Sequence, residues 1–125
     1  MAPAYFNLLP PDQRTDPVQL AREILERKPD PVPNWRNGWY RRVLEYHAGR
    51  LSATELLHQG GPSRTNLCEA HFVIGLAALG RGNRAEAKAQ FTKCVATNVY
   101  DYAEYMWSRS FLTCIDDPTW FPWAK

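Results

Sequence analysis

The feature that most constrains the fold is a helix-start pattern that recurs along the chain. In this pattern a short polar side chain caps the first turn, and an acid or amide three residues later reaches back to it. Glycine or proline follows each stretch near the point where a helix would end. The capping residues are Asp16, Ser52, Asn66, Asn83 and Asp101, followed by Gln19, Glu55, Glu69, Glu86 and Glu104. These starts and ends predict helices at 16–28, 35–48, 52–59, 66–80, 83–97 and 101–115.

Apolar residues recur at intervals of three and four, which is helical spacing, and no stretch alternates with the period of a strand. Segment 66–80 is apolar on most of its circumference, so we expect other helices to cover it on both sides. Segments 1–15 and 118–125 are rich in proline, and we expect both to be extended. The sequence therefore predicts an all-α fold.

The composition suits one compact domain of 125 residues. Lys and Arg total 15 against 13 Asp and Glu, and without a basic run this balance does not favour nucleic acid as a partner. The three cysteines include no Cys-x-x-Cys pair, which indicates free thiols in a reducing compartment. With no apolar run long enough for a membrane span and no signal sequence at the start, we expect a cytoplasmic location, or a periplasmic one if a signal has been removed.

Segment 66–99 resembles the tetratricopeptide repeat (TPR), a helical hairpin of about 34 residues. Small residues stand where two antiparallel helices must approach closely, a glycine stands at the turn, and an aromatic ring stands where it would fill the space between the helices. These positions are Gly75, Ala87 and Cys94 for the small residues, Gly82 for the turn and Phe91 for the ring. The resemblance implies a short right-handed stack of antiparallel hairpins.

The rest of the chain fits this stack less closely. Segment 35–65 looks like a degenerate repeat, because it keeps a helix, the turn glycine Gly49 and a capped second helix. Segments 16–28 and 101–115 are expected to be capping helices, so that the TPR-like domain spans 16–117 and an aromatic tail follows at 118–125.

Residues 35–115 are similar, more narrowly, to bacterial TPR proteins of the NlpI lipoprotein type. That likeness implies a non-catalytic adaptor or scaffold, whose groove binds a peptide or helix of another protein. By resemblance to the family, the groove residues are Glu69, Phe72, Val73, Leu76, Leu79, Ala103, Met106 and Trp107. We expect Phe72 and Trp107 to be the anchors. The resemblance implies no cofactor.

Two other functions stay open. The aromatic residues of 101–115 and of the tail predict either a tail that folds back over the last helix or an exposed surface, which would let the chain self-associate as an assembly subunit. Trp120 and Trp123 are structural in the first case and form a docking surface in the second. The third hypothesis is a small metal- or anion-dependent enzyme.

The residues that support the enzyme hypothesis also have simpler interpretations. Cys68, His71 and Cys94 have the residue types of zinc ligands, but they also suit a helical core, and Cys68 with Cys94 would suit a disulfide. The loop 60–65 offers amides and an arginine to an anion, although a plain connection explains it. The Gly-x-Gly-x-x-Ala pattern at 80–85 follows a helix rather than a strand, so we interpret it as a helix turn. Asp116 and Asp117 suit a helix end better than a catalytic pair.

Overall fold

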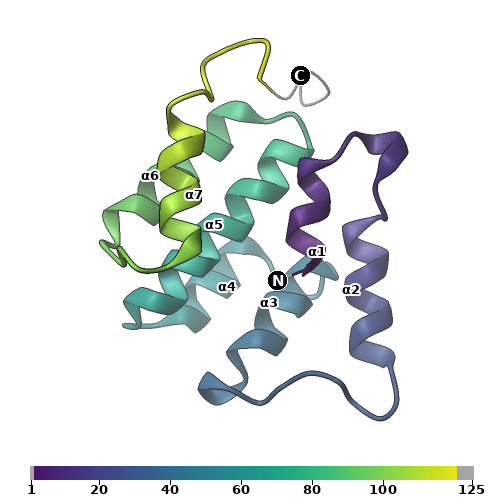
Figure 1. The fold of residues 1–125 in the computed structure, drawn as a ribbon. Coiled ribbons are helices and arrows are strands. Elements are labelled where there is room, and N and C mark those ends of the chain that lie inside the picture. Colours follow the sequence, from purple (N-terminus) through teal and green to yellow (C-terminus); the bar gives the residue numbers. More distant parts are fainter. Residues whose placement is uncertain (1, 121–125) are drawn as a thin grey trace.

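The computed structural model describes residues 2–120, and every regular element in that range is helical (Figure 1). Short 3-10 turns η1 (Phe6–Leu8), η2 (Pro11–Gln13) and η3 (Arg36–Gly38) connect the α-helices. The α-helices are α1 (Ala2–Tyr5), α2 (Pro17–Glu26), α3 (Trp39–His47), α4 (Ala53–Gly60), α5 (Arg64–Gly80), α6 (Arg84–Ala96) and α7 (Ala103–Leu112). The predicted all-α class is confirmed.

Local capping explains where most of the helices begin. Ser52 and Glu55 form the complete reciprocal box at the start of α4, and the side chains of Asp16 and Asn83 cap α2 and α6. Helix α3, which has no predicted cap, begins at Trp39 rather than at residue 35, because Arg36, Asn37 and Gly38 have positive φ. Two of the five predicted capping residues are also wrong. α5 begins earlier than expected, because the side chain of Ser63 rather than Asn66 accepts from the first turn.

The start of α7 is the second difference. This helix has Tyr102, not Asp101, at its N-cap, and no side-chain hydrogen bond closes that cap. Helix α7 packs against both α5 and α6.

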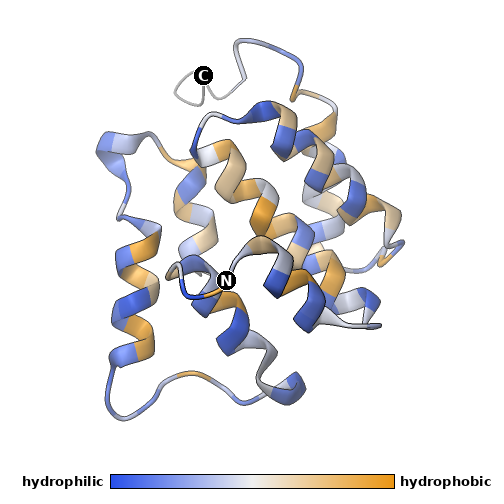
Figure 2. Cartoon of the chain, turned by 180° about the vertical axis from the view of Figure 1, so that it is seen from behind, coloured by the Kyte–Doolittle hydropathy of each residue, from blue (hydrophilic) through white to orange (hydrophobic). Residues whose placement is uncertain are grey.

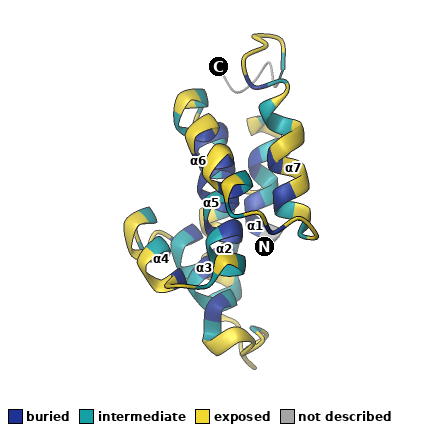
Figure 3. Cartoon of the chain, turned by 90° about the vertical axis from the view of Figure 1, so that its left-hand side faces the viewer, coloured by how far each residue is buried: buried dark blue, intermediate teal, exposed yellow. Residues whose placement is uncertain are grey.

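Helix α5 lies at the centre of the fold. It contacts α1, α3, α4, α6 and α7, and its buried residues lie on all sides of the helix (Figures 1 and 3). This confirms that the apolar circumference of this segment is covered on both sides. Peripheral α2 instead carries both hydrophobic and hydrophilic stripes, and its apolar stripe packs on Leu44 and Ala48 (Figure 2).

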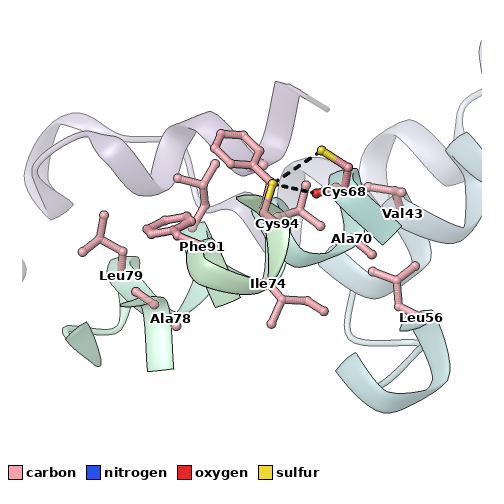
Figure 4. Packing of buried hydrophobic residues seen from close by; sticks show 14 of the residues in the cluster. Val43, Leu56, Cys68, Ala70, Ile74, Ala78, Leu79, Phe91 and Cys94 are labelled. Atoms are coloured by element: carbon pink, nitrogen blue, oxygen red, sulfur yellow. Dashed lines mark hydrogen bonds between the residues drawn. The ribbon is translucent and has the colours of Figure 1, made fainter. Parts of the chain in front are cut away.

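Contact between α5 and α6 depends on Gly75. A Cβ added at Gly75 would lie 2.6 Å from Cε1 of Phe91, which is fully buried between the helices (Figure 4). Gly82 turns the chain between the two helices with φ +77°, a conformation that favours glycine. The predicted close approach at Gly75, Ala87 and Phe91 is confirmed.

Segment 1–15 is not extended, in contrast to the prediction. Pro3 lies in the first turn of α1 and Pro11 begins η2, positions where the missing N–H of proline costs little. The segment also packs closely on the end of α5, because a Cβ at Gly80 would lie 2.2 Å from Oδ1 of Asn7. Proline content alone therefore mispredicts this segment.

At the other end, the chain folds back as far as residue 120. The ring of Trp120 lies 5.3 Å from the ring of Phe111 and 5.8 Å from Cζ of Arg84. Arg84 also donates from Nη1 to the carbonyl oxygens of Ile115 (3.1 Å) and Asp117 (3.2 Å). Trp120 is therefore structural, and Trp123 lies outside the described residues.

Among the helices that the structure describes, none combines the length and the apolar character needed to cross a bilayer.

Candidate interaction groove

The surface predicted to bind a partner is formed by α3, α5 and α7, and residues 2–8 of the same chain lie on it. We call residues 2–8 the N-terminal segment. Helix α1 contacts both α3 and α5, and η1 contacts α5 (Figure 1). Side chains of Pro3 and Ala4 are fully buried at this contact. A short apolar segment of the chain therefore lies where the groove is predicted.

Five of the predicted groove residues belong to the core. Sequence analysis placed them on an open surface, and the structure corrects that expectation. The buried residues are Glu69, Phe72, Val73, Leu76 and Leu79. The physical reason is that a large apolar face left in water is costly, so the neighbouring helices and the N-terminal segment pack on α5 from several sides.

Tyr5 is the aromatic residue that the groove receives. Its ring lies 6.2 Å from Phe72 and 5.9 Å from Trp107, so it contacts both residues predicted to be anchors. Burial raises the pKa of Tyr5, with a further increase from the negative charge of Glu104. Tyr5 therefore stays a neutral phenol at physiological pH.

Glu69 gives the groove a polar end. One carboxylate oxygen pairs with Nη1 of Arg36 at 2.7 Å, and the other accepts from Nε1 of Trp39 at 2.8 Å. Arg36 and Asn37, which precede Trp39, have backbone φ angles of +52° and +56°, values that residues other than glycine rarely adopt. Glu69 on α5 therefore fixes the residues at the start of α3 against α5.

Two further titratable groups lie around the groove. Burial raises the pKa of Glu104, with a further increase from the charge of Glu69. Burial likewise raises the pKa of Tyr40. This surface thus combines aromatic rings with partly buried carboxylates, which suits a segment that carries an aromatic ring and a hydrogen-bond donor.

The other three predicted residues lie on α7 and are exposed. Met106 keeps 52% of its surface exposed and Trp107 keeps 44%, while Ala103 is also open to solvent. A hollow of about 280 Å³ continues this face along Met106, Arg109 and Thr113. The α7 side of the predicted groove is therefore accessible to solvent.

Sequence reasoning missed Tyr5, Arg36 and Tyr40 as groove residues. Tyr5 lies in a segment that was expected to be extended, so its ring was not assigned a position. Trp39 and Tyr40 lie in segment 35–48, before the turn of the degenerate repeat. Helical periodicity applied to this segment would have predicted that one of the two rings faces segment 66–80. Nothing local in the sequence predicts the pairing of Arg36 with Glu69.

The residues proposed as metal ligands do not come together as a site. Sγ of Cys68 and Sγ of Cys94 lie 3.5 Å apart as free thiols (Figure 4). His71 bonds instead through Nδ1 to Oε1 of Gln90 at 2.8 Å. Across residues 2–120, no three His, Cys, Asp or Glu side chains gather as metal ligands would. The hydrogen bond to Cys68, together with burial, raises the pKa of the Cys94 thiol.

The remaining sequence motifs have structural explanations. The glycine pattern at 80–85 is the turn between α5 and α6, where Asn83 caps the second helix. Asp116 pairs with Nζ of Lys88 at 2.6 Å, whereas Asp117 accepts from the backbone N–H of Thr119 at 2.8 Å. Loop 60–65 supplies Ser63 as the cap of α5.

Comparisons with protein-family models, with curated proteins and with solved structures gave no match to this chain.

Proposed function

We propose that this chain is a non-catalytic protein–protein interaction module, a TPR-like stack that binds a short segment of a partner protein on α3, α5 and α7. Helix contacts support the stack. Consecutive helices from α2 to α7 contact each other, and so do the alternate pairs α3 with α5 and α5 with α7. Stacked hairpins produce this pattern, because the first helix of each hairpin lies beside the first helix of the next.

The observation that carries the proposal is the position of the N-terminal segment. This segment lies on the face that a TPR-like groove would offer to a peptide, and its Tyr5 ring contacts Phe72 on α5 and Trp107 on α7. A surface that takes up residues 2–8 of its own chain has the shape and the chemistry to take up a similar segment of another protein. We expect that partner segment to be one short helical turn with small apolar residues before an aromatic ring.

The N-terminal segment would compete with the partner. A tethered segment acts at an effective concentration in the millimolar range, so it lowers the apparent affinity of any partner that uses the same contacts. Met106 and Trp107 on α7 are exposed, so a partner can contact them before the N-terminal segment dissociates from the groove.

A peptide copying residues 2–13 tests the proposal. The full chain carrying Tyr5→Ala should bind the labelled peptide, because its own segment has lost both ring contacts, and the native chain should bind at least ~10-fold more weakly. Fluorescence anisotropy measures both. Adding Trp107→Ala should remove binding, whereas Trp35→Ala, which removes an exposed Trp immediately before η3, should not. No binding to the Tyr5→Ala chain, or equal losses from both Trp variants, would contradict the proposal.

Self-association through α7 is the second candidate. The exposed aromatic and sulfur side chains of Trp107 and Met106 favour it, because apolar groups at the end of a helical stack are common dimer contacts. Light scattering at two protein concentrations separates the two functions. A monomer at both concentrations would exclude the assembly role and leave the peptide-binding role intact.

A further inference from the structure

A second hollow lies away from the groove, at the end where α3 and α5 finish. Its volume is about 410 Å³, within the range of small-molecule sites. Three parts of the chain form its walls: the N-terminal region with Asn7 and Arg14, the end of α3 with Tyr46 and His47, and the end of α5 with Arg81. Small residues at Gly49, Ala77 and Gly80 leave the space open.

Two buried polar atoms of these walls have no hydrogen-bond partner among the described residues. They are Nη1 of Arg14 and Nε2 of His47, and the His47 side chain belongs to a residue that is only 6% exposed. The other terminal nitrogen of Arg14 donates to the carbonyl oxygen of Gly80 at 3.4 Å, which orients the guanidinium in the hollow. A buried cationic donor without an acceptor is costly, so these atoms indicate a missing polar partner.

The charge around the hollow favours an anion. Arg14 and Arg81 contribute two guanidinium groups, while burial keeps His47 neutral at pH 7 by lowering its pKa to about 4. Asp16 is the carboxylate in the wall, and its Oδ1 already accepts from the backbone N–H of Val18 at 3.0 Å in the cap of α2. Tyr46 adds a neutral phenol, whose pKa is raised by burial and lowered in part by the charge of Arg81 and a hydrogen bond with it.

We propose that this hollow binds a small molecule through an oxyanion group, either a phosphate or a carboxylate, held between the guanidinium groups of Arg14 and Arg81. Guanidinium presents paired donors that match the oxygens of both groups. His47 and Tyr46 provide further polar contacts on the α3 side. The site is separate from Trp107 and the α7 face, but it shares Asn7 with the N-terminal segment, so a partner that displaced this segment would also remove part of one wall of the hollow.

Isothermal titration calorimetry on the full chain tests the site with sodium phosphate and with citrate, at constant ionic strength set by NaCl. We expect saturable binding of at least one of these anions, and the anion with the lower Kd identifies whether the group is a phosphate or a carboxylate. Arg14→Gln should weaken binding at least ~10-fold, because a charge-assisted hydrogen bond is lost. Arg27→Gln, which removes an exposed arginine outside the hollow, should leave Kd unchanged.

Arg81→Gln provides a second test if Arg14→Gln fails to fold, since Arg81 is exposed and its replacement leaves the core intact. This variant should also weaken binding. No saturable heat from either anion would overturn the proposal, because water would then be the partner of the two buried atoms. An equal loss of affinity in Arg27→Gln would overturn it as well, because the binding would then reflect general surface charge.

Discussion

His47 is buried where α3 ends, and that burial lowers its pKa from 6.5 to about 4. Between these two values the unfolded chain binds a proton that the folded chain does not bind. The free energy of unfolding therefore falls as the pH drops from 7 toward 4. At ~1.4 kcal/mol for each pKa unit, His47 contributes roughly 3 kcal/mol to that loss at most.

The prediction is that His47→Gln reduces the loss of stability between pH 7.5 and pH 4.5. Urea unfolding in a buffer without phosphate or citrate measures it. His58→Gln is the matched control, because His58 is exposed on α4. An unchanged pH dependence in His47→Gln would show that other groups are responsible.

The three cysteines also differ in burial. Cys68 and Cys94 are fully buried between α5 and α6, whereas Cys114 after α7 is partly exposed. A thiol reagent such as DTNB should therefore modify one thiol quickly in the native chain and the other two only as the chain unfolds. Cys114→Ser should remove the fast phase. Equal rates for all three thiols would contradict the packing of α5 against α6.

At the scale of helices, the α5–α6 pair depends on the absence of a side chain at Gly75. Alanine at this position would otherwise favour the helix by about 1 kcal/mol. The added methyl group would instead meet the rigid ring of Phe91 at 2.6 Å, and overpacking of this kind costs about 1–3 kcal/mol. We expect Gly75→Ala to lower the free energy of unfolding.

Gly60→Ala is the control for this prediction, measured by chemical denaturation under the same conditions. Its Cβ would meet Cδ2 of Leu67 at 3.2 Å, the far end of a side chain that can move by a few tenths of an ångström. This change should alter stability by less than about 0.5 kcal/mol. If Gly75→Ala is as stable as the native chain, the two helices do not pack as described.

At the scale of the whole molecule, the N-terminal segment links the first residues of the chain to α3, α5 and α7. Tyr5→Ala removes the ring contacts with Phe72 and Trp107, each worth about 0.5–1.5 kcal/mol beyond the buried area. The backbone amides of residues 5–9 should then exchange with deuterium at least ~10-fold faster. Mass spectrometry of an N-terminal peptic peptide measures this exchange.

Trp35→Ala is the control here, because it removes an exposed ring outside these contacts. It should leave the exchange of the N-terminal amides unchanged. Exchange that is equally slow in Tyr5→Ala would show that Pro3, Ala4 and Asn7 hold the segment without the ring, and a partner peptide would then displace it much less readily.

Much of the helical fold was predictable from neighbouring residues. Ser52 with Glu55 and Asn83 with Glu86 place the starts of α4 and α6, because a cap forms between residues three apart. Asn66 failed as a cap because Ser63 offers the same hydrogen bond earlier in the chain. Capping preferences allow either Ser63 or Asn66 to cap this helix and do not predict which of them does.

The candidate groove was predictable only in part. The resemblance to the family places Phe72 and Trp107 in the groove, and in the structure both rings contact the ring of Tyr5. Their accessibility was not predictable, because Phe72 is buried among Tyr5, Phe91 and Phe111, rings that lie far apart in the sequence. The hollow beside Arg14 and His47 was missed for the same reason.

The sequence by itself determined most of the helices from α2 to α7, the turn at Gly82 and the close approach of Gly75 to Phe91, because hydrogen bonding, capping and helical periodicity act within a few residues or within one hairpin. Only the tertiary structure decided that the groove holds the N-terminal segment and that Arg14 reaches the ends of α3 and α5. Those outcomes depend on which apolar surfaces, far apart in the sequence, pack against each other and exclude water, and the whole chain contributes to that choice.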